Sequence, residues 1–317
     1  MNWAAICDEA FAGFEMSSMP PTVQLPALPY VVTLFVQRSR DETVPMKELA
    51  AILETDSALT VELLKYVNSS ACGLRSKANT VLQALTFLGC GRSRMFVIAT
   101  GIEAAMRARF SKLIDQTKFW SENLQKAIFA REIALLLKTD PDVAFIGALL
   151  QDYLLPALTN DLSDQYSEFM QSRETPAKTL SEFEQEHFGW DHGLAAACLA
   201  RAWKLPGELV CCILYHHGGL QILADPQLGR SPVAAAALSA LLPDQFRPGH
   251  QGLALLKKLE RKWPAFSLER VAESVDRQYQ EMGLGIRNDS SLVQRCQSLA
   301  SEQSVTPAGT LESAAVR

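Results

Sequence analysis

The chain has 317 residues, of which 48% are hydrophobic and 21% are charged. This composition is typical of a globular protein with one or two buried cores, and it excludes a chain that is disordered throughout. The formal net charge of −5 excludes the broad basic surface of a general nucleic-acid-binding protein. We therefore expect no nucleic-acid partner.

The cysteines and the first residues bear on the compartment. The seven cysteines are odd in number and include no C-x-x-C pair, which argues against a zinc ribbon or a secreted disulfide scaffold. Residues 1–20 carry Asp8, Glu9 and Glu15 where a signal peptide needs positive charge. No run of about 18 uncharged apolar residues is present, so no membrane insertion is predicted. These features predict a cytoplasmic protein with reduced thiols.

Helical periodicity runs through most of the chain. Apolar residues recur at spacings of three and four in the segments 46–53, 59–67, 95–106 and 120–135, and each segment predicts one buried stripe on a helix. The strict alternation typical of strands is hard to find. The predicted fold class is all-α.

Capping residues stand at the predicted helix starts. Gly89 and Gly91 predict the end of a short helix before a longer one that opens near Arg92. The capping residues, in chain order, are Thr80 with Gln83, Asp140 before Pro141, Thr179 with Glu182, Ser231 before Pro232, and Ser267.

Short motifs spread over residues 20–220 together resemble a known family. In chain order they are L-P-A-L-P at 25–29, M-K-E-L-A-A-I-L-E-T-D-S-A-L-T at 46–60, L-L-K-Y-V-N-S at 63–69, A-L-T-F-L-G at 84–89, F-W at 119–120, A-L-L-Q-D at 148–152, E-H at 186–187, H-G at 192–193 and H-H at 216–217. The combination resembles the HDOD family, the bacterial HD-related output domain. This family is related to the HD metal-dependent phosphohydrolases, and its metal ligands are often eroded.

The resemblance implies an all-helical output or adaptor module of bacterial signalling, often linked to two-component or cyclic-di-GMP circuits. It also implies an organisation in two helical lobes, the second an HD-like bundle. The expected divisions are a lead-in helix at 1–19, the HDOD domain at 20–220 (lobes 20–112 and 113–220), a helical extension at 221–300 and a flexible tail at 301–317.

An active HD site would need imidazoles and carboxylates that converge on a metal ion. Against the pattern of active relatives, the first histidine position is Glu122, and the His-Asp pair has become Gln151-Asp152. The lysine expected three residues after the aspartate is Leu155, and the closing aspartate is missing from the helix expected around residues 234–242, where the first acid is Asp244 beyond the helix. The first metal site is therefore predicted to be dismantled, and no cofactor is expected.

The remaining ligand types are Asp152, His192, His216 and His217. Three imidazoles and a carboxylate are enough to hold one divalent ion such as zinc, iron or nickel. The alternative is structural: His216 and His217 would satisfy carbonyls at the end of an apolar helix, and Asp152 would be a buried acceptor that joins helices. We expect the structural role, with no metal bound.

Two further features have alternative interpretations. Arg92 and Arg94 follow Gly91 at the start of the long helix, where they are candidates for binding an anion or a partner, or else form a solvated face with ion pairs to a neighbouring helix. Cys211-Cys212 lies in an apolar helix, which indicates core packing, with redox sensing as the second interpretation.

The functional prediction is a non-catalytic signal-transduction adaptor. It would bind a signalling protein (a kinase, a response regulator or a cyclic-dinucleotide enzyme) in the cleft between the lobes or in the groove of the eroded metal site. One alternative is a divergent phosphohydrolase that uses Asp152, His192, His216 and His217. Another is a sensor that binds a small nucleotide without cutting it.

Overall fold

The computed structural model describes residues 1–69, 72–74, 76–171, 178–281 and 291–305. All of the regular secondary structure in these residues is helical. No strand occurs within these residues, which confirms the all-α prediction. None of the helices in these described ranges has the length and apolar character needed to cross a membrane.

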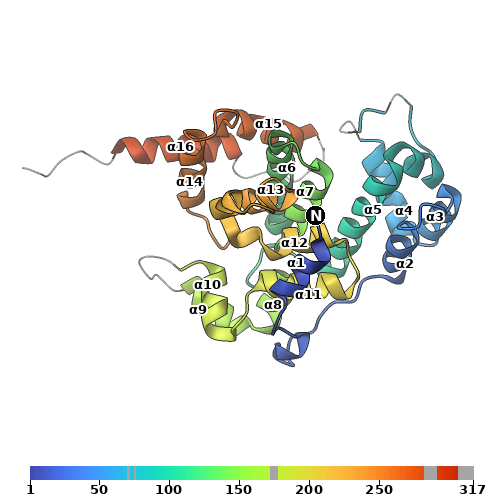
Figure 1. Cartoon of the computed structure of the whole chain (residues 1–317), viewed down its shortest axis with the longest axis horizontal. Coiled ribbons are helices and arrows are strands. Elements are labelled where there is room, and N and C mark those ends of the chain that lie inside the picture. Colours follow the sequence, from blue (N-terminus) through green and yellow to red (C-terminus); the bar gives the residue numbers. More distant parts are fainter. Residues whose placement is uncertain (70–71, 75, 172–177, 282–290, 306–317) are drawn as a thin grey trace, which may run out of the picture.

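The first lobe packs three short helices against a long one, on the right of Figure 1. Its helices are α2 (Tyr30–Arg38), α3 (Met46–Glu54), α4 (Ser57–Val67) and α5 (Val81–Arg107). Gly101 of α5 allows α2 to approach closely, because a Cβ at this position would lie 2.5 Å from Val32 Cγ2. Gly89 has φ 76° and interrupts α5, which confirms the predicted break before the longer segment.

The second lobe is built around one central helix, α6. Its helices are α6 (Gln116–Leu137), α7 (Pro141–Leu150), α8 (Leu155–Asp161), α9 (Ser163–Gln171), α10 (Leu180–Phe188), α11 (His192–Ala202), α12 (Gly207–Leu214), η3 (His216–Ala224) and α13 (Pro232–Ser239). Helix α6 packs against α7 and α13, and residues on all of its faces are buried. Between Phe119 and Ala130 every residue of α6 is buried, so a charged side chain in this stretch needs a partner within the protein.

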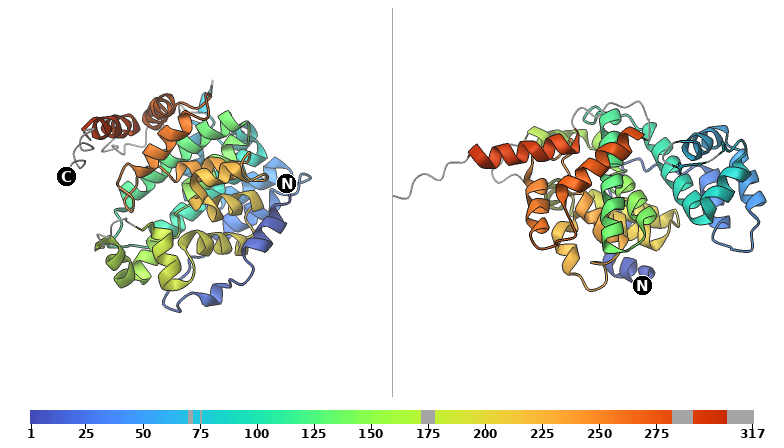
Figure 2. Two further views of the ribbon diagram at one scale, coloured as in Figure 1. Left: turned by 60° about the vertical axis from the view of Figure 1, so that its left-hand side comes forward. Right: turned by 90° about the horizontal axis from the view of Figure 1, so that it is seen from above.

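The ends of the chain pack on this second lobe. The N-terminal elements are α1 (Trp3–Ala10), which lies on α12, and η1 (Met16–Ser18). The C-terminal elements are α14 (Gln251–Glu260), α15 (Leu268–Glu281), which packs on α6, and α16 (Leu292–Val305), which extends away from the body in Figure 2. Helix α16 runs past residue 301, where the tail was expected to begin, and residues 306–317 lie outside the described part.

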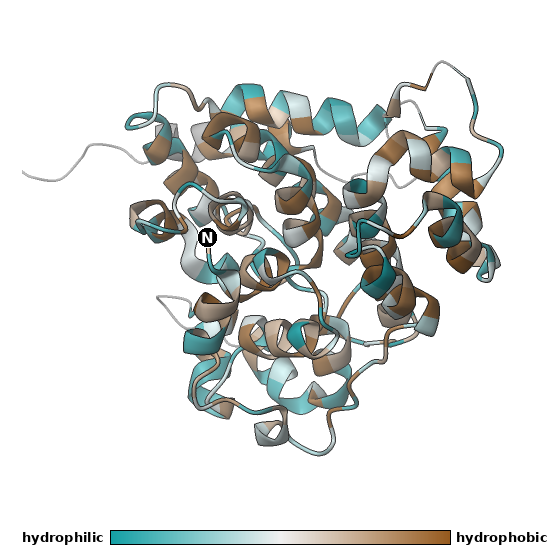
Figure 3. Ribbon diagram, turned by 45° about the vertical axis from the view of Figure 1, so that its right-hand side comes forward, coloured by the Kyte–Doolittle hydropathy of each residue, from teal (hydrophilic) through white to brown (hydrophobic). Residues whose placement is uncertain are grey.

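The capping signals place the helix starts correctly. Thr179 and Glu182 form a full capping box at α10. Thr80 accepts from the backbone N–H of Gln83, but the Gln83 side chain accepts from Asn79 and not from Thr80. Hydrophobic residues concentrate on the helix faces that meet in the interior, as the brown stretches in Figure 3 show.

Candidate functional site

A buried lysine in the middle of α6 lies between two carboxylates. The Lys126 side chain is 1% exposed, and its Nζ lies 2.8 Å from Asp152 Oδ2 and 2.7 Å from Asp244 Oδ2. Burial alone would lower the pKa of Lys126, but the two carboxylates raise it above its ordinary value. The group is therefore an ammonium ion at neutral pH, and it places a positive charge between the two acids.

Asp244, which lies beyond the helix expected to carry the closing aspartate, also reaches this centre. Helix α13 ends at Ser239, and paired backbone hydrogen bonds between Asp244 and Arg247 then fold the chain back toward α6. The Asp244 Oδ1 atom accepts from the backbone N–H groups of Phe246 and Arg247, which leaves Oδ2 directed at Lys126. Burial would raise the pKa of Asp244, but the charges of Lys126 and Arg247 lower it.

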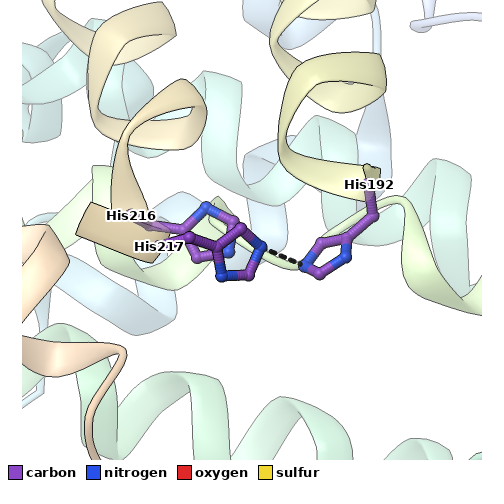
Figure 4. Close-up of side chains that lie close together, drawn as sticks. All are labelled: His192, His216 and His217. Atoms are coloured by element: carbon purple, nitrogen blue, oxygen red, sulfur yellow. Dashed lines mark hydrogen bonds between the residues drawn. The ribbon is translucent and has the colours of Figure 1, made fainter. Parts of the chain in front are cut away.

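The other oxygen of Asp152 faces a cluster of three histidines. Figure 4 shows how these histidines lie relative to one another. Asp152 follows the end of α7, His192 is the first residue of α11, and His216 and His217 open η3 directly after α12. Asp152 Oδ1 lies 3.2 Å from His192 Nε2 and 3.3 Å from His216 Nε2, and His217 Nε2 lies 3.1 Å from His192 Nε2. The four residues named from the sequence as remaining ligand types are thus brought together.

Glu184 of α10 supports this cluster and was missed in the sequence analysis. Its Oε2 atom lies 2.6 Å from His192 Nδ1 and accepts the backbone N–H of the same residue at 2.9 Å, while Oε1 accepts from the Tyr166 hydroxyl at 2.6 Å. Burial would lower the pKa of His192, but Glu184 and Asp152 raise it to about 10. The available signal was position, because Glu184 falls on the buried face of α10 with Leu180 and Phe183.

Protonation differs across the cluster. Burial lowers the pKa of His217, and the neighbouring His216 and His192 lower it further, to well below its ordinary value. Burial would raise the pKa of Asp152, but the charge of Lys126, the hydrogen bond from His192 and the proximity of His216 hold it well below its ordinary value. His192 therefore carries the proton, and its Nε2–H is directed at Asp152 and at the neutral His217.

The same atoms fit the donor set of one metal ion. In a tetrahedral zinc site with bonds of about 2.0–2.1 Å, donor atoms lie roughly 3.3 Å apart. The Asp152–His192, Asp152–His216 and His192–His217 spacings of 3.2, 3.3 and 3.1 Å match this value, and the three histidines offer ligand atoms that all lie within 4.8 Å of one another. The second ring nitrogens of His192 and His216 contact the Glu184 carboxylate and the Ile213 carbonyl, as the supporting partners of metal-bound histidines do. His216 Nε2 is buried without a hydrogen bond.

The other predicted positions lie beside this centre and do not complete it. Glu122 accepts the backbone N–H of Gln245, and burial together with Asp244 raises its pKa to about 7. Gln151 Nε2 lies 3.3 Å from Asp152 Oδ2 and adds a neutral donor to this carboxylate. Leu155 is buried at the edge of the centre, where its side chain offers no charge to a phosphate.

Two cavities of very different size lie near these residues. The cavity that touches Lys126, Asp152 and His217 has a volume of about 20 Å³, enough for about one water molecule. A cleft between the lobes, lined by α4, α5, α6 and α7, has a volume of about 780 Å³. Of these two cavities in the described part of the chain, only the cleft between the lobes has room for a ligand larger than a water molecule.

The two candidate arginines separate in the structure. Arg92 lines the cleft between the lobes, and its Nε lies 2.7 Å from Asp142 Oδ2 of α7. Arg94 donates to the backbone carbonyl and hydroxyl of Ser39 inside the first lobe. Arg92 is thus an ion pair between the lobes, and Arg94 belongs to the packing of the first lobe.

Solved structures of bacterial proteins share this fold. A Geobacter sulfurreducens HDOD domain protein of unknown function has 19% identity and a TM-score of 0.58, with 95% of this chain and 94% of that chain covered. A Shewanella amazonensis SB2B protein, provisionally named a phosphohydrolase, has 18% identity, a TM-score of 0.58 and coverage of 94% and 93%. A Marinobacter aquaeolei VT8 protein, provisionally named a signal transduction protein, has 18% identity, a TM-score of 0.55 and coverage of 96% and 65%.

Sequence comparison gives the family. An uncharacterized protein of Treponema pallidum (strain Nichols) is 23% identical over 201 residues, which are 61% of this chain and 37% of that protein. The chain thus spans little more than a third of the length of this relative. The model of the HDOD domain matches residues 25–218, which is more than half of the chain. The chain belongs to the HDOD family.

Proposed function

We propose that this protein is a non-catalytic binding module of bacterial signal transduction, in which the remnant of an HD centre holds helices together and the cleft between the lobes binds a partner. The observation that carries the proposal is Lys126, whose ammonium lies within 2.8 Å of both Asp152 and Asp244. An internal cation at this point supplies the charge that two carboxylates would otherwise draw from a metal ion.

The geometry of the centre argues against two-metal hydrolysis. That mechanism needs two cations about 3.5–4 Å apart, with room for a phosphate that bridges them. Here Lys126 takes one oxygen from each of two acids, and the adjoining cavity of about 20 Å³ has no room for a phosphodiester. The groove at the eroded metal site is thus a poorer binding surface than the cleft.

The cleft suits a helix of a signalling partner. Its floor is apolar, with side chains from α5, α6 and α7 that include Met95, Phe96, Leu124 and Ile146. Its rim carries charges of both signs that are already paired, such as Arg92 with Asp142. An apolar floor with a charge-balanced rim fits the apolar face of an amphipathic helix better than a highly charged nucleotide.

The first test combines metal content with hydrolysis. The full chain, expressed without a histidine tag, is analysed for its elements and incubated with bis(p-nitrophenyl) phosphate in the presence of manganese, zinc, nickel or iron. We expect trace metal and no turnover above buffer. Turnover that is lost in His217→Ala would refute the non-catalytic assignment.

The spacing of the histidine cluster favours a second candidate, a phosphohydrolase with a single metal ion. His192, His216, His217 and Asp152 would hold the ion, which would supply Lewis-acid activation of a bound water. Near-stoichiometric metal that falls on changing His216 and His217 to Ala, together with turnover, would establish this candidate. Metal without turnover would leave the binding module in place with a structural ion.

A separate test addresses the cleft. Ala104 lines the cleft on α5 and is exposed, so Ala104→Trp fills the cleft without disturbing the core. Ala51→Trp, at an exposed position of α3 outside the cleft, is the matched control. We expect the wild type and Ala51→Trp to retain proteins from a bacterial lysate that Ala104→Trp does not retain. Equal retention by all three proteins would contradict the cleft as the binding surface.

A further inference from the structure

The N-terminal helix α1 and the helix α12 each contribute one cysteine to a sulfur–sulfur contact. Cys7 Sγ lies 3.5 Å from Cys211 Sγ, and the two residues are 4% and 0% exposed. The close approach of the helices depends on Gly207 at the start of α12, because a Cβ at this position would lie 2.8 Å from Trp3 Cβ. The two thiols are thus held together by packing between segments about two hundred residues apart.

The surroundings make the two thiols unequal. The hydrogen bond from Cys211 lowers the pKa of Cys7, burial opposes this, and the guanidinium of Arg201 lowers it further. Arg201 of α11 is held nearby by an ion pair with Asp8, the residue after Cys7. The pKa of Cys211 is raised, first by the hydrogen bond to Cys7 and then by burial. A lowered pKa at Cys7 favours the thiolate that begins thiol–disulfide exchange, and the neighbouring Cys211 thiol lies within reach to complete it.

The other cysteines do not share this arrangement. Burial raises the pKa of Cys72, Cys198, Cys212 and Cys296, and the Cys90 thiol donates to the Ser39 backbone carbonyl. Cys212 packs against α7, where the absence of a side chain at Gly147 makes room for it. The adjacent pair Cys211-Cys212 is therefore divided: Cys212 belongs to the core, and the partner of Cys211 is Cys7.

We propose that Cys7 and Cys211 are a redox modification site that forms a reversible disulfide between α1 and α12. The Cys7 thiolate attacks one sulfur of an oxidised low-molecular-weight disulfide, forms a mixed disulfide and releases one thiolate. Cys211 gives up its proton and attacks Cys7 Sγ, which releases the second low-molecular-weight thiol. The two protein thiols are oxidised, and the small disulfide is reduced to two thiols.

Helix α1 gives an oxidant access to the two thiols and allows the side-chain rotation that a disulfide needs. The helix is short, and its outer face, which includes Ala4 and Asp8, is exposed, so local lifting admits a small oxidant. A rotation of the Cys7 side chain then has to close the distance of 3.5 Å to the roughly 2 Å of a disulfide. Because α12 leads directly into His216 and His217, the bond fixes α1 to the helix that positions the histidine cluster.

The test oxidises the full chain with oxidised glutathione and maps the product without reduction. We expect the mass of two hydrogen atoms to be lost, a linked pair of peptides that contain Cys7 and Cys211, and full reversal with dithiothreitol. Because the bond closes a loop of about two hundred residues, the melting temperature of the oxidised protein should rise by about 10 °C.

Two variants keep the result interpretable. Cys7→Ser lies on a peripheral helix and should fold, but should neither form the linked peptide nor gain stability on oxidation. Cys198→Ser, on α11, is the matched control and should behave as the wild type. A stable glutathione adduct on Cys7 without the link, first reaction at another cysteine, or no oxidation of either thiol would each overturn the proposal.

Discussion

The buried centre of this protein has two halves that share Asp152 and balance its charge in different ways. On one side, the Lys126 ammonium contacts Asp152 Oδ2 and Asp244 Oδ2. On the other side, His192 and His216 approach Asp152 Oδ1, and His217 approaches His192. Lys126, Asp152, Asp244, His192 and His216 are buried, and His217 is half-buried, so the buried charges need partners within the protein.

The two halves differ in the source of the positive charge that balances the buried carboxylates. An ammonium on a covalently attached side chain is always present at neutral pH, so the carboxylate half needs no external cation. The histidine half depends on the proton of His192, or on an ion in its place. In the carboxylate half, the Lys126 ammonium thus supplies the positive charge that the two acids need.

The largest loss of stability is expected from removal of the Lys126 ammonium. Lys126→Met keeps most of the apolar stem but leaves Asp152 and Asp244 buried without their cation. We expect the free energy of unfolding at pH 7 to fall by about 3–5 kcal/mol, as measured by urea denaturation. The double variant Lys126→Met/Asp244→Asn should recover part of the loss, because one of the two uncompensated charges is gone.

A matched control lies two helical turns earlier. Lys118 is also on α6, but its side chain is 49% exposed and lies 3.9 Å from Glu122. Lys118→Met should change the free energy of unfolding by less than about 1 kcal/mol. If Lys126→Met lowers the free energy of unfolding no more than Lys118→Met does, the Lys126 ammonium does not compensate the charges of Asp152 and Asp244. The two halves then no longer differ in the way described above.

A second prediction concerns the charge of Glu122, which lies at the edge of the carboxylate half. Burial and Asp244 raise the pKa of Glu122 from 4.5 to about 7, so folding favours the protonated acid. As the pH rises from 4.5 to 7, ionisation of this group destabilises the folded wild type by up to about 3 kcal/mol. Glu122→Gln, which stays neutral and can still accept from Gln245, should avoid this loss.

The measurement is urea denaturation at pH 5, 6, 7 and 8. The difference in stability between Glu122→Gln and the wild type should grow in favour of the variant up to about pH 7 and then level off. Parallel stability curves across this range would show that Glu122 ionises in the folded protein as it does in the unfolded chain.

The helical elements were predictable because their signals are local. Apolar spacing and caps such as the Thr179 box depend on residues a few positions apart, and the break at Gly89 depends on one backbone conformation. The positions of Asp152, His192, His216 and His217 came from the family resemblance, and the structure brings the four residues together.

The compensating charges were not predictable in the same way. Lys126 looks like an ordinary solvated residue, since nothing local shows that all faces of α6 are covered. Glu184 shares the face of Leu180 and Phe183, but the sequence does not show that His192 is its partner. Asp244 was discounted because it follows Pro243, and only the fold of the turn shows that its carboxylate reaches Lys126. A buried charge is recognised by its partners, and these are distant in sequence.

The mildest prediction concerns the histidine half. In Glu184→Gln the amide can still accept from His192 and donate to the Tyr166 hydroxyl, so the packing is kept and only the negative charge is removed. Because the pKa of His192 is raised to about 10 in the wild type, its stabilising contribution is complete below about pH 6.5 and is lost as the pH rises through 10. The variant should therefore lose about 2 kcal/mol at pH 7 and approach the wild type near pH 10.

Nitrogen NMR of the histidine side chains tests this prediction directly. The wild type should keep His192 doubly protonated well above pH 7, and Glu184→Gln should move its titration to lower pH. Glu186→Gln, at an exposed position on the same helix, is the control and should leave the His192 titration unchanged. If His192 titrates alike in both variants, Asp152 alone holds the proton on His192, and the histidine half is balanced without help from α10.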